Sequence, residues 1–415
     1  MNKAKSYSIS KETVLAAFKQ VKTKGGSAGY DRQSIEDFEK DLKDNLYKIW
    51  NRMSSGSYFP PPVLRVEIPK GDGSMRPLGI PSVSDRVAQT VAKLYLEPIL
   101  ERVFHPDSYG YRPNKSAHDA VAKARKMCWQ YSWVVDLDIK GFFDNIDHDL
   151  MMKALRAHTD SKWILLYVER WLKAPVQLED GILVSRDKGT PQGGVVSPLL
   201  ANLFLHYAFD VWINRNYPEN PFERFADDAI VHCRTREEAE IIRQAIGQRM
   251  EQCKLELHPL KTKIVYCKSD QRKGDAEFTS FDFLGFTFRM RTCRTKDGRL
   301  FNGFNPAISA KAIKRIRDEI RRWGVRRWSD LSIFEVSARC NPTLRGWIAY
   351  YGRFNASALY PILKQFNLAL VNWARRKYKT RRKRRKWIFQ WFKQMDKQYP
   401  KLFYHWKLGV GFSTV

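Results

Sequence analysis

The sequence has no apolar run of about 18 residues, the length that a membrane-spanning helix requires. Its first residues, MNKAKSYSIS, also lack the apolar stretch of a secretory signal peptide. Both absences argue against a membrane-embedded or exported protein, and we expect a cytoplasmic location with no membrane partner.

Cysteine is scarce as well. The chain holds 6 cysteines, and none of them forms a Cys-x-x-Cys pair. Structural zinc sites use such pairs, so the spacing argues against one. Free thiols without an export signal fit a reducing compartment. We find no internal repeat.

Acidic residues are few beside the basic ones. The chain has 44 Asp and Glu against 73 Lys and Arg, a formal net charge of +29. A surplus of this size indicates a polyanionic partner, most often a nucleic acid. Because 43% of the residues are hydrophobic, we still expect most of the chain to fold around a core.

Local patterns predict helices and strands in a non-alternating order. We expect a helix capped by Ser10 and ended by Gly25, a second one within 26–50, a strand pair within 63–81, and a helix over 84–104. A strand should follow near 133–139, and a helix from 197 with Ser197 as its cap and Pro198 at its first position. From about residue 305 the pattern is helical, so the predicted class is α+β.

Two adjacent acids, Asp227 and Asp228, stand between apolar runs in ENPFERFADDAIVHCRT. The flanking runs predict a hairpin with the carboxylates at or near its tip. Neighbouring like charges repel, so the pair needs positive charge beside it. The strand WVVDLDI offers Asp136 and Asp138, which share one face because side chains alternate along a strand. If this strand lies beside the hairpin, three or four carboxylates meet and suit Mg²⁺, which prefers oxygen ligands.

Several motifs together resemble the reverse transcriptases encoded by bacterial group II introns, also called maturases. The resemblance runs from about residue 10 to 410 and rests on IPKGDGSMRPLGIPSVSDRV, SYGYRPNKSAHDAV, VVDLDIKGFFDNIDH, GTPQGGVVSPLLANLFLH, FADD, HPLKTKIV, FDFLGFTF and LRGWIAYY. It implies a right-hand polymerase of fingers and palm, followed by an all-α thumb or maturase X domain and a basic C-terminal segment. One departure is Phe225, where the family's tetrad begins with Tyr. We expect it to alter template or nucleotide handling without abolishing activity.

The resemblance assigns the catalytic metal ligands to Asp138, Asp227 and Asp228. Strand parity alone leaves Asp136 open, but the resemblance favours Asp138 because Phe143 then falls where the family places its sugar-discriminating aromatic ring. Phe142 and Phe143 should point in different directions, so that one is core and the other the gate. We expect Asp136 to be structural and Asp144 to stabilise the turn after the strand.

Further roles follow from the same resemblance. The incoming nucleotide should be held by Lys70, Arg76, Phe143, Gln192 and Gly193, where a glycine lets the backbone approach the new base pair closely. Lys261 either protonates the leaving pyrophosphate or contacts a phosphate. Phe283, Leu284 and Gly285 resemble the primer-grip turn.

The C-terminal part is basic and helical. Residues 308–323 predict a basic amphipathic helix with an apolar face of Ile308, Ile313, Ile316 and Ile320. Arg345 stands in a helix with Trp347, Tyr350 and Tyr351, at least half of whose rings we expect in the core. Residues 375–386 contain ten Lys or Arg and no acid. The resemblance makes this run a DNA- and RNA-binding segment, with Arg381, Arg382, Arg384 and Arg385 as its representatives.

We therefore expect an N-terminal extension (1–55), fingers and palm (56–295), a thumb or X domain (296–374) and a basic segment (375–415). The predicted function is RNA-directed DNA synthesis with two Mg²⁺ ions, for which Mn²⁺ can substitute, together with splicing and retrohoming of an intron. The partners would be group II intron RNA, an RNA template with a DNA primer, target DNA and deoxynucleoside triphosphates, with nucleoid association during targeting. Missing cysteine pairs lead us to expect no endonuclease domain. The alternatives are a splicing-only maturase and a reverse transcriptase adopted by the host for defence or repair.

Overall fold

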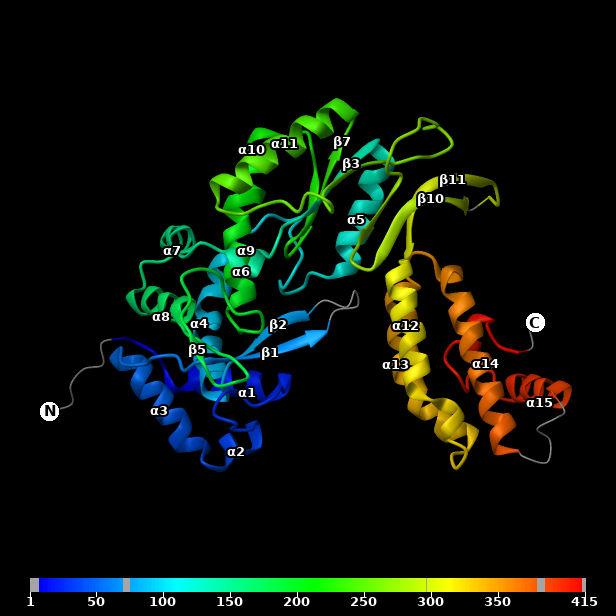
Figure 1. The fold of residues 1–415 in the computed structure, drawn as a ribbon, viewed down its shortest axis with the longest axis horizontal. Helices are drawn as coiled ribbons and strands as arrows, with labels where there is room; N and C mark the ends of the chain where they lie inside the picture. Colours follow the sequence, from blue (N-terminus) through cyan, green and yellow to red (C-terminus); the bar gives the residue numbers. More distant parts are fainter. Residues whose placement is uncertain (1–6, 70–74, 296, 379–384, 413–415) are drawn as a thin grey trace. The chain divides into compact units, whose positions relative to one another are not determined.

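The computed structural model describes residues 7–69, 75–295, 297–378 and 385–412. The chain divides into two compact units, one of Met1–Ala120 with Trp133–Ile264 and the other of Val121–Ser132 with Val265–Val415 (Figure 1). Both units mix helices with strands, so the predicted α+β class is confirmed.

The first unit contains helices of very different length. They are α1 (Lys11–Lys24), α2 (Ile35–Lys40), α3 (Leu42–Ser55), α4 (Val83–Leu100), α6 (Phe142–Asn145), α7 (His148–Arg156), α8 (Lys162–Lys173), α9 (Ser197–Leu205), the π-helix η1 (His206–Asp210), α10 (Val211–Asn216) and α11 (Arg236–Gln252).

The N-terminal helices begin as the sequence predicts and then depart from it. The Ser10 side chain accepts a hydrogen bond from the Thr13 backbone N–H, and Gly25 ends α1. The single helix expected within 26–50 is wrong, because the chain breaks at Asp41 into α2 and α3. Asp41 has φ −114° and ψ 40°, outside the helical region, and its side chain makes no capping hydrogen bond.

A small sheet with strand order β2-β1-β4-β5 contains the predicted strand pair. It consists of β1 (Val63–Pro69), β2 (Met75–Ile80), β4 (Val176–Gln177) and β5 (Leu183–Val184). β1 and β2 are antiparallel, from Leu64 opposite Ile80 to Pro69 opposite Met75. The second sheet, with order β6-β7-β3-β8, contains β3 (Trp133–Asp138), β6 (Phe222–Phe225), β7 (Asp228–Cys233) and β8 (Lys263–Tyr266).

The second sheet forms part of the core of the first unit. Val135 and Leu137 of β3 and Val231 of β7 belong to one buried cluster with residues of α4, α7, α8 and α9. Figure 1 shows α11 lying over β3 and β7, which it contacts. Burial of Val135, Leu137 and Val231 fixes the positions of β3 and β7, whose paired ends carry Asp138 and Asp228.

The helix expected from Ser197 has a different start and an interruption. Val196 occupies the cap position without a side-chain hydrogen bond, so the prediction of Ser197 as cap is wrong. The Ser197 hydroxyl instead accepts a hydrogen bond from Thr190 (2.8 Å). The helix passes through η1 before α10, and such π-bulges often lie near functional sites.

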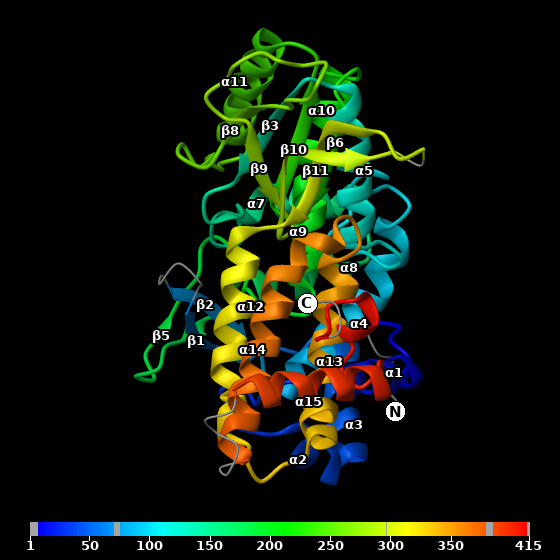
Figure 2. The ribbon, with the colours of Figure 1, turned by 90° about the vertical axis from the view of Figure 1, so that its right-hand side faces the viewer.

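The second unit combines a three-stranded sheet with a helical region. Its elements are most of α5 (Ala117–Gln130), β9 (Ser280–Phe283), β10 (Phe286–Arg294), β11 (Leu300–Ile308), α12 (Ala310–Trp323), η2 (Val325–Arg327), α13 (Ile333–Tyr351), η3 (Ala356–Leu359), α14 (Tyr360–Lys377), α15 (Arg385–Gln398) and η5 (Trp406–Leu408). Figure 2 shows α12, α13 and α14 running side by side, with α15 crossing them.

Helix α12 begins later than predicted. Ile308 is the last residue of β11, and Ser309 caps the helix through a hydrogen bond from the Ala312 N–H. The strand pair β10–β11 therefore extends past residue 305, where we expected helix, and Ile308 does not belong to the helix's apolar face. Ile316 and Ile320 do lie buried on that face.

Candidate polymerase site

The two adjacent acids lie at a tight turn between β6 and β7. Phe225 pairs with Asp228, which leaves Ala226 and Asp227 as the two loop residues. Ala226 has φ 58°, the sign that a type II′ turn requires at its first loop position. An alanine is strained in this conformation, and such strain concentrates at functional sites. The predicted hairpin with acids at its tip is confirmed.

The strand β3 brings a third acid to this turn. Asp138 lies directly opposite Asp228 in the antiparallel β3–β7 pair. Residues in this relation point to one face of a sheet, with Cβ atoms about 4.5–5.5 Å apart. Asp136 pairs with Ile230, two residues further from the turn. The register therefore favours Asp138 over Asp136 as the partner of the Asp pair.

The charges at the turn interact with one another. Burial raises the pKa of the Asp227 carboxyl above its ordinary value, and the charge of Asp138 adds to this rise, whereas Arg76 and Arg224 oppose it. The Lys261 ammonium lies 3.2 Å from a carboxylate oxygen of Asp138. Lys261 is mostly exposed, so it is free to move toward a phosphate group of a substrate.

A buried arginine, Arg224, is hydrogen-bonded to the β6–β7 turn. Arg224 and Asp210 form a two-pronged ion pair, with distances of 2.7 Å and 2.6 Å, and their side chains are 1% and 0% exposed. The same guanidinium donates to the side chain of Asn202 (3.0 Å) and to the carbonyl oxygen of Ala226 (2.9 Å). Asp210 is the last residue of η1, so the π-helix and the turn are linked directly.

The donor set suits a hard divalent cation. Asp138, Asp227 and Asp228 offer only carboxylate oxygens, the ligands that Mg²⁺ prefers. Burial raises the pKa of the Asp227 carboxyl and the charge of Asp138 adds to the rise, and a cation between the acids would offset both effects. Within the described ranges, no three acidic, His or Cys side chains already converge as a ligand group. The residues fit such a cation by chemistry and by register.

Two of the predicted nucleotide-binding residues are in contact. The Arg76 guanidinium on β2 donates to the Gln192 side-chain oxygen (2.8 Å). The Gln192 carbonyl accepts a hydrogen bond from the Gly79 N–H (2.7 Å). Gly193 has φ 119°, and a methyl group there would clash with the Gly79 carbonyl oxygen. The structure thus requires glycine at 193 for packing against β2. Lys70 lies outside the described residues.

The predicted sugar gate lies in a short helix. Phe142 and Phe143 both belong to α6 and to the core, with exposures of 2% and 6%. The turn before α6 is held by the Asn145 side chain, which donates to the Lys140 and Gly141 carbonyls (3.2 and 3.1 Å). Among the described residues, the Asp144 carboxylate accepts no hydrogen bond from this turn, so Asn145 takes the role expected of Asp144.

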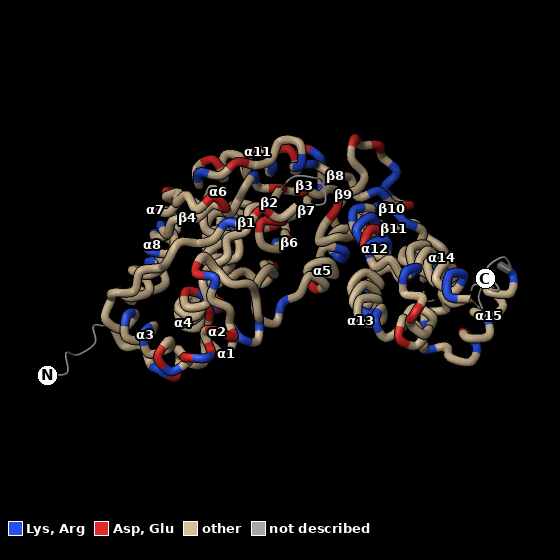
Figure 3. Tube along the Cα trace, turned by 60° about the horizontal axis from the view of Figure 1, so that its bottom comes forward, with Lys and Arg blue, Asp and Glu red and all other residues tan. Residues whose placement is uncertain are grey.

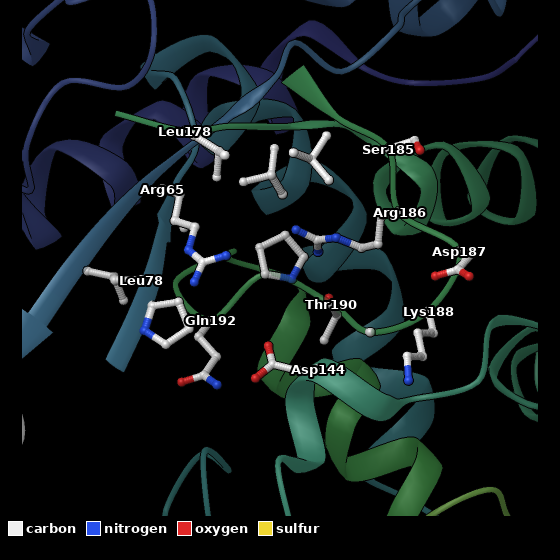
Figure 4. A pocket seen from close by; sticks show the side chains of 16 residues that line it. Arg65, Leu78, Asp144, Leu178, Ser185, Arg186, Asp187, Lys188, Thr190 and Gln192 are labelled. Atoms are coloured by element: carbon white, nitrogen blue, oxygen red, sulfur yellow. The ribbon is translucent and has the colours of Figure 1, made fainter. Parts of the chain in front are cut away.

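A cavity of about 520 Å³ opens beside Gln192. Figure 4 shows Arg65 and Arg186 pointing into it from opposite sides, with Asp144 and Lys188 at its edge. Apolar walls come from both sheet strands and loops, namely Pro77, Leu78, Val176, Leu178, Val184 and Pro191. Two guanidinium groups above apolar walls suit the phosphate and base of a nucleotide. Sequence patterns did not identify this pair, because Arg65 and Arg186 stand outside the motifs.

In the second unit, the predicted primer-grip residues form a tight turn. Leu284 and Gly285 link β9 to β10 with φ values of 52° and 81°, as in a type I′ turn. The Tyr350 hydroxyl donates to the Leu284 carbonyl (2.9 Å), and Phe283 is buried. The turn is therefore anchored to α13.

Several aromatic residues of the C-terminal helices are buried or half-buried. Trp347 stacks on Trp323 at 5.3 Å, and Tyr351 is 4% exposed. Arg345 is exposed and lies 5.5 Å from the ring of Tyr404. Trp373, next to the basic run, is fully buried and donates to the Trp328 carbonyl. Of the three rings of which we expected at least half in the core, only Tyr351 is buried, whereas Trp347 and Tyr350 are half-buried.

The basic run itself is only partly described. Arg375, Arg376 and Lys377 end α14, and Figure 3 shows further basic residues along α12. Arg381, Arg382 and Arg384 lie outside the described residues, as does the side chain of Arg385, the first residue of α15.

No helix in the described ranges is both long and apolar enough to cross a lipid bilayer.

Comparisons with known proteins agree with the motifs. Residues 68–288, more than half of the chain, match the family model of reverse transcriptase (RNA-dependent DNA polymerase). Residues 313–391 match the group II intron, maturase-specific domain. This family is generally dependent on divalent metal ions.

Individual relatives give the same result over shorter segments. Protein YkfC of Escherichia coli is 36% identical over 181 residues, covering 42% of this chain and 47% of that protein. The group II intron-encoded protein LtrA of Lactococcus lactis is 38% identical over 165 residues, covering 40% and 27%. The putative COX1/OXI3 intron 1 protein of Saccharomyces cerevisiae is 29% identical over 202 residues, covering 49% and 24%. The matched segments thus span less than half of each relative. The chain belongs to the reverse transcriptase family and carries a group II intron maturase-specific domain.

Proposed function

We propose that the protein is an RNA-directed DNA polymerase that also binds its intron RNA to assist splicing and retrohoming by target-primed reverse transcription. The observation that carries the proposal is the pairing of Asp138 with Asp228, next to Asp227 at the β6–β7 turn, within the segment that matches the reverse transcriptase model. The substrates would be an RNA template, a DNA primer or target DNA, and deoxynucleoside triphosphates. The reaction would take place in the bacterial cytoplasm and at the nucleoid.

The residues divide the work as follows. The three acids hold two Mg²⁺ ions, or Mn²⁺ as substitutes. When bound, such ions activate the primer 3′-hydroxyl and stabilise the leaving pyrophosphate. Arg76 and Lys70 hold the triphosphate, with Gln192 orienting Arg76. Lys261 contacts the phosphate that leaves, from its place beside Asp138. Phe283, Leu284 and Gly285 support the primer.

In this scheme, the cavity beside Gln192 would bind the single-stranded template. Arg186 makes no hydrogen bond with another described residue, and burial lowers the pKa of its guanidinium below the ordinary value, with Asp144 opposing. A phosphate of the single-stranded template would accept hydrogen bonds from the Arg186 guanidinium. The apolar walls would receive the base.

Two other functions remain to be tested against this one. A splicing-only maturase needs no catalytic acids. The turn that carries Asp227 and Asp228, here called the acid turn, and the buried Arg224–Asp210 ion pair beneath it therefore favour the polymerase. A reverse transcriptase adopted for defence or repair would share the whole site. We would measure DNA synthesis on an RNA template and splicing of the intron RNA with the same preparation. Splicing without synthesis would contradict the polymerase, and flanking DNA without intron structure would contradict the intron role.

Phe143 should set the choice between deoxyribonucleotides and ribonucleotides. A ring beneath the sugar excludes the 2′-hydroxyl, the group that distinguishes the two. Phe143→Val should raise the ratio of ribonucleotide to deoxyribonucleotide incorporation about 10–100-fold, the range for one change of shape in a pocket. Single-nucleotide extension with each triphosphate measures this ratio. Phe142→Val is the matched control, since both rings are buried. If only the Phe142 variant shows a raised ratio of ribonucleotide incorporation, then Phe142 and not Phe143 is the residue that excludes ribonucleotides.

The basic run should provide affinity for intron RNA and target DNA separately from the chemistry. Each phosphate contact contributes about 0.7–0.9 to the slope of log affinity against log salt. Four replacements by Gln should therefore flatten the slope by roughly 3 if each residue contacts one phosphate. The residues to replace are Arg381, Arg382, Arg384 and Arg385. Extension of a pre-annealed primer should change much less.

The matched comparison replaces four basic residues of the N-terminal helices and loop. These are Lys19, Lys22, Lys24 and Arg32. Filter binding of intron RNA across a salt series compares both variants with the unchanged protein. If the N-terminal variant shows the flatter slope and the C-terminal variant does not, the RNA-binding surface lies in the N-terminal region.

A further inference from the structure

Residues 108–110, just before Tyr111, pack closely against the acid turn. Ser108 bridges to Arg224, and the Tyr109 N–H donates to the Arg224 carbonyl (2.8 Å). A methyl group on Gly110 would clash with the backbone nitrogen of Ala226. The Asn202 side chain donates to the Gly110 carbonyl (2.6 Å). The position of the next residue is therefore fixed relative to the acids.

Tyr111 itself is held in an unfavourable backbone conformation. Its φ is 58°, in the left-handed region that bulky residues rarely adopt. Its side chain is nevertheless 53% exposed, and the hydroxyl makes no hydrogen bond with any other described residue. Its ring centroid lies 6.5 Å from that of Phe225. Backbone strain at an exposed tyrosine whose hydroxyl has no hydrogen-bond partner among the described residues is typical of a functional position.

The Tyr111 phenol interacts electrostatically with Asp227 at the acid turn and with Arg76 on β2. Burial raises the pKa of Tyr111 above its ordinary value, Asp227 adds to the rise, and Arg76 opposes it. The hydroxyl therefore stays protonated at neutral pH and is available as a donor. Phe225, its aromatic neighbour at the turn, has no hydroxyl to offer.

We propose that Tyr111 contacts the substrate directly, donating a hydrogen bond from its hydroxyl to the minor-groove edge of the primer-terminal base pair. This inference rests on the proposed polymerase function. Every base pair carries an acceptor there, purine N3 or pyrimidine O2, so the contact would be independent of sequence. The minor groove of an A-form duplex is wide and shallow, which lets a side chain reach that edge. A contact of this kind reads the shape of the pair but not its identity, which suits an enzyme that copies any sequence.

The test combines a protein change with a primer change. Tyr111→Phe removes only the donor, and a primer ending in 3-deazaadenine removes only the acceptor. Each change alone should slow single-turnover extension about 3–10-fold, the range for one hydrogen bond. Both together should slow it no further. Tyr95→Phe, an exposed tyrosine on α4, is the matched control and should leave both primers unaffected.

Binding supplies a second measurement that does not need catalysis. Fluorescence anisotropy with EDTA measures the affinity of each variant for the two primer–template duplexes, and Tyr111→Phe should lose affinity only for the natural one. Equal affinity and equal extension rates for Tyr111→Phe and the unchanged protein would overturn the inference, and so would fully additive losses. An unchanged protein that extends neither primer would contradict the polymerase function itself, and the binding comparison would still decide the role of Tyr111.

Discussion

Asp138→Asn should lower RNA-templated primer extension at least about a thousandfold, while Asp136→Asn should stay within a few fold of the unchanged protein. Losing one carboxylate from a metal-binding group removes several kcal/mol of transition-state stabilisation, and about 1.4 kcal/mol corresponds to a factor of ten. Both acids lie on β3, but only Asp138 is opposite Asp228 and beside Lys261. The two variants change charge equally, so their difference isolates position.

Single-turnover extension of an annealed DNA primer on RNA measures both variants. Circular dichroism checks that they fold alike. A large loss in the Asp136 variant with a small loss in the Asp138 variant would reverse the assignment. Similar small losses in both would remove β3 from the catalytic group.

Arg224→Gln should destabilise the first unit by about 3–5 kcal/mol, because it leaves Asp210 buried without a partner. Extension should fall together with stability, since the same arginine holds the Ala226 carbonyl of the acid turn. Urea denaturation measures the free energy of unfolding, and primer extension at low temperature measures the activity.

A double variant separates the two effects. Arg224→Met with Asp210→Leu removes both charges and replaces them with apolar groups, which often restores stability at a buried pair. We expect stability to recover while extension stays low, because neither new side chain binds the Ala226 carbonyl. Full recovery of extension would show that Arg224 stabilises the fold without positioning the turn.

The acid turn could be predicted from sequence because its signals are local. Apolar runs on both sides of Asp227 and Asp228 fix a hairpin, and alternation along 133–139 puts Asp136 and Asp138 on one face. The choice between those two depends on register, which local pattern does not determine. The motif resemblance favoured Asp138, and the pairing with Asp228 agrees with that choice.

Other features depend on contacts between distant residues and were missed. Arg224 belongs to none of the motifs, yet it is buried and donates hydrogen bonds to Asp210 and Asn202. Gly193 was explained by approach to a base pair, whereas packing against Gly79 on β2 already requires it. Ile308 fits the spacing of a helix face, but pairing with Phe286 keeps it in a strand. These tertiary contacts leave no signal in the periodicity of the sequence, which reports only local structure.

The most direct test of the acid turn as the polymerase centre is incorporation of a single deoxynucleotide by the unchanged protein and by Asp227→Asn. Both proteins receive the same RNA-templated DNA primer with Mg²⁺, and the affinity for the duplex is measured in parallel. The assignment predicts rapid incorporation by the unchanged protein and a loss of at least about a thousandfold in the variant, at nearly equal affinity. Comparable incorporation by Asp227→Asn would contradict it.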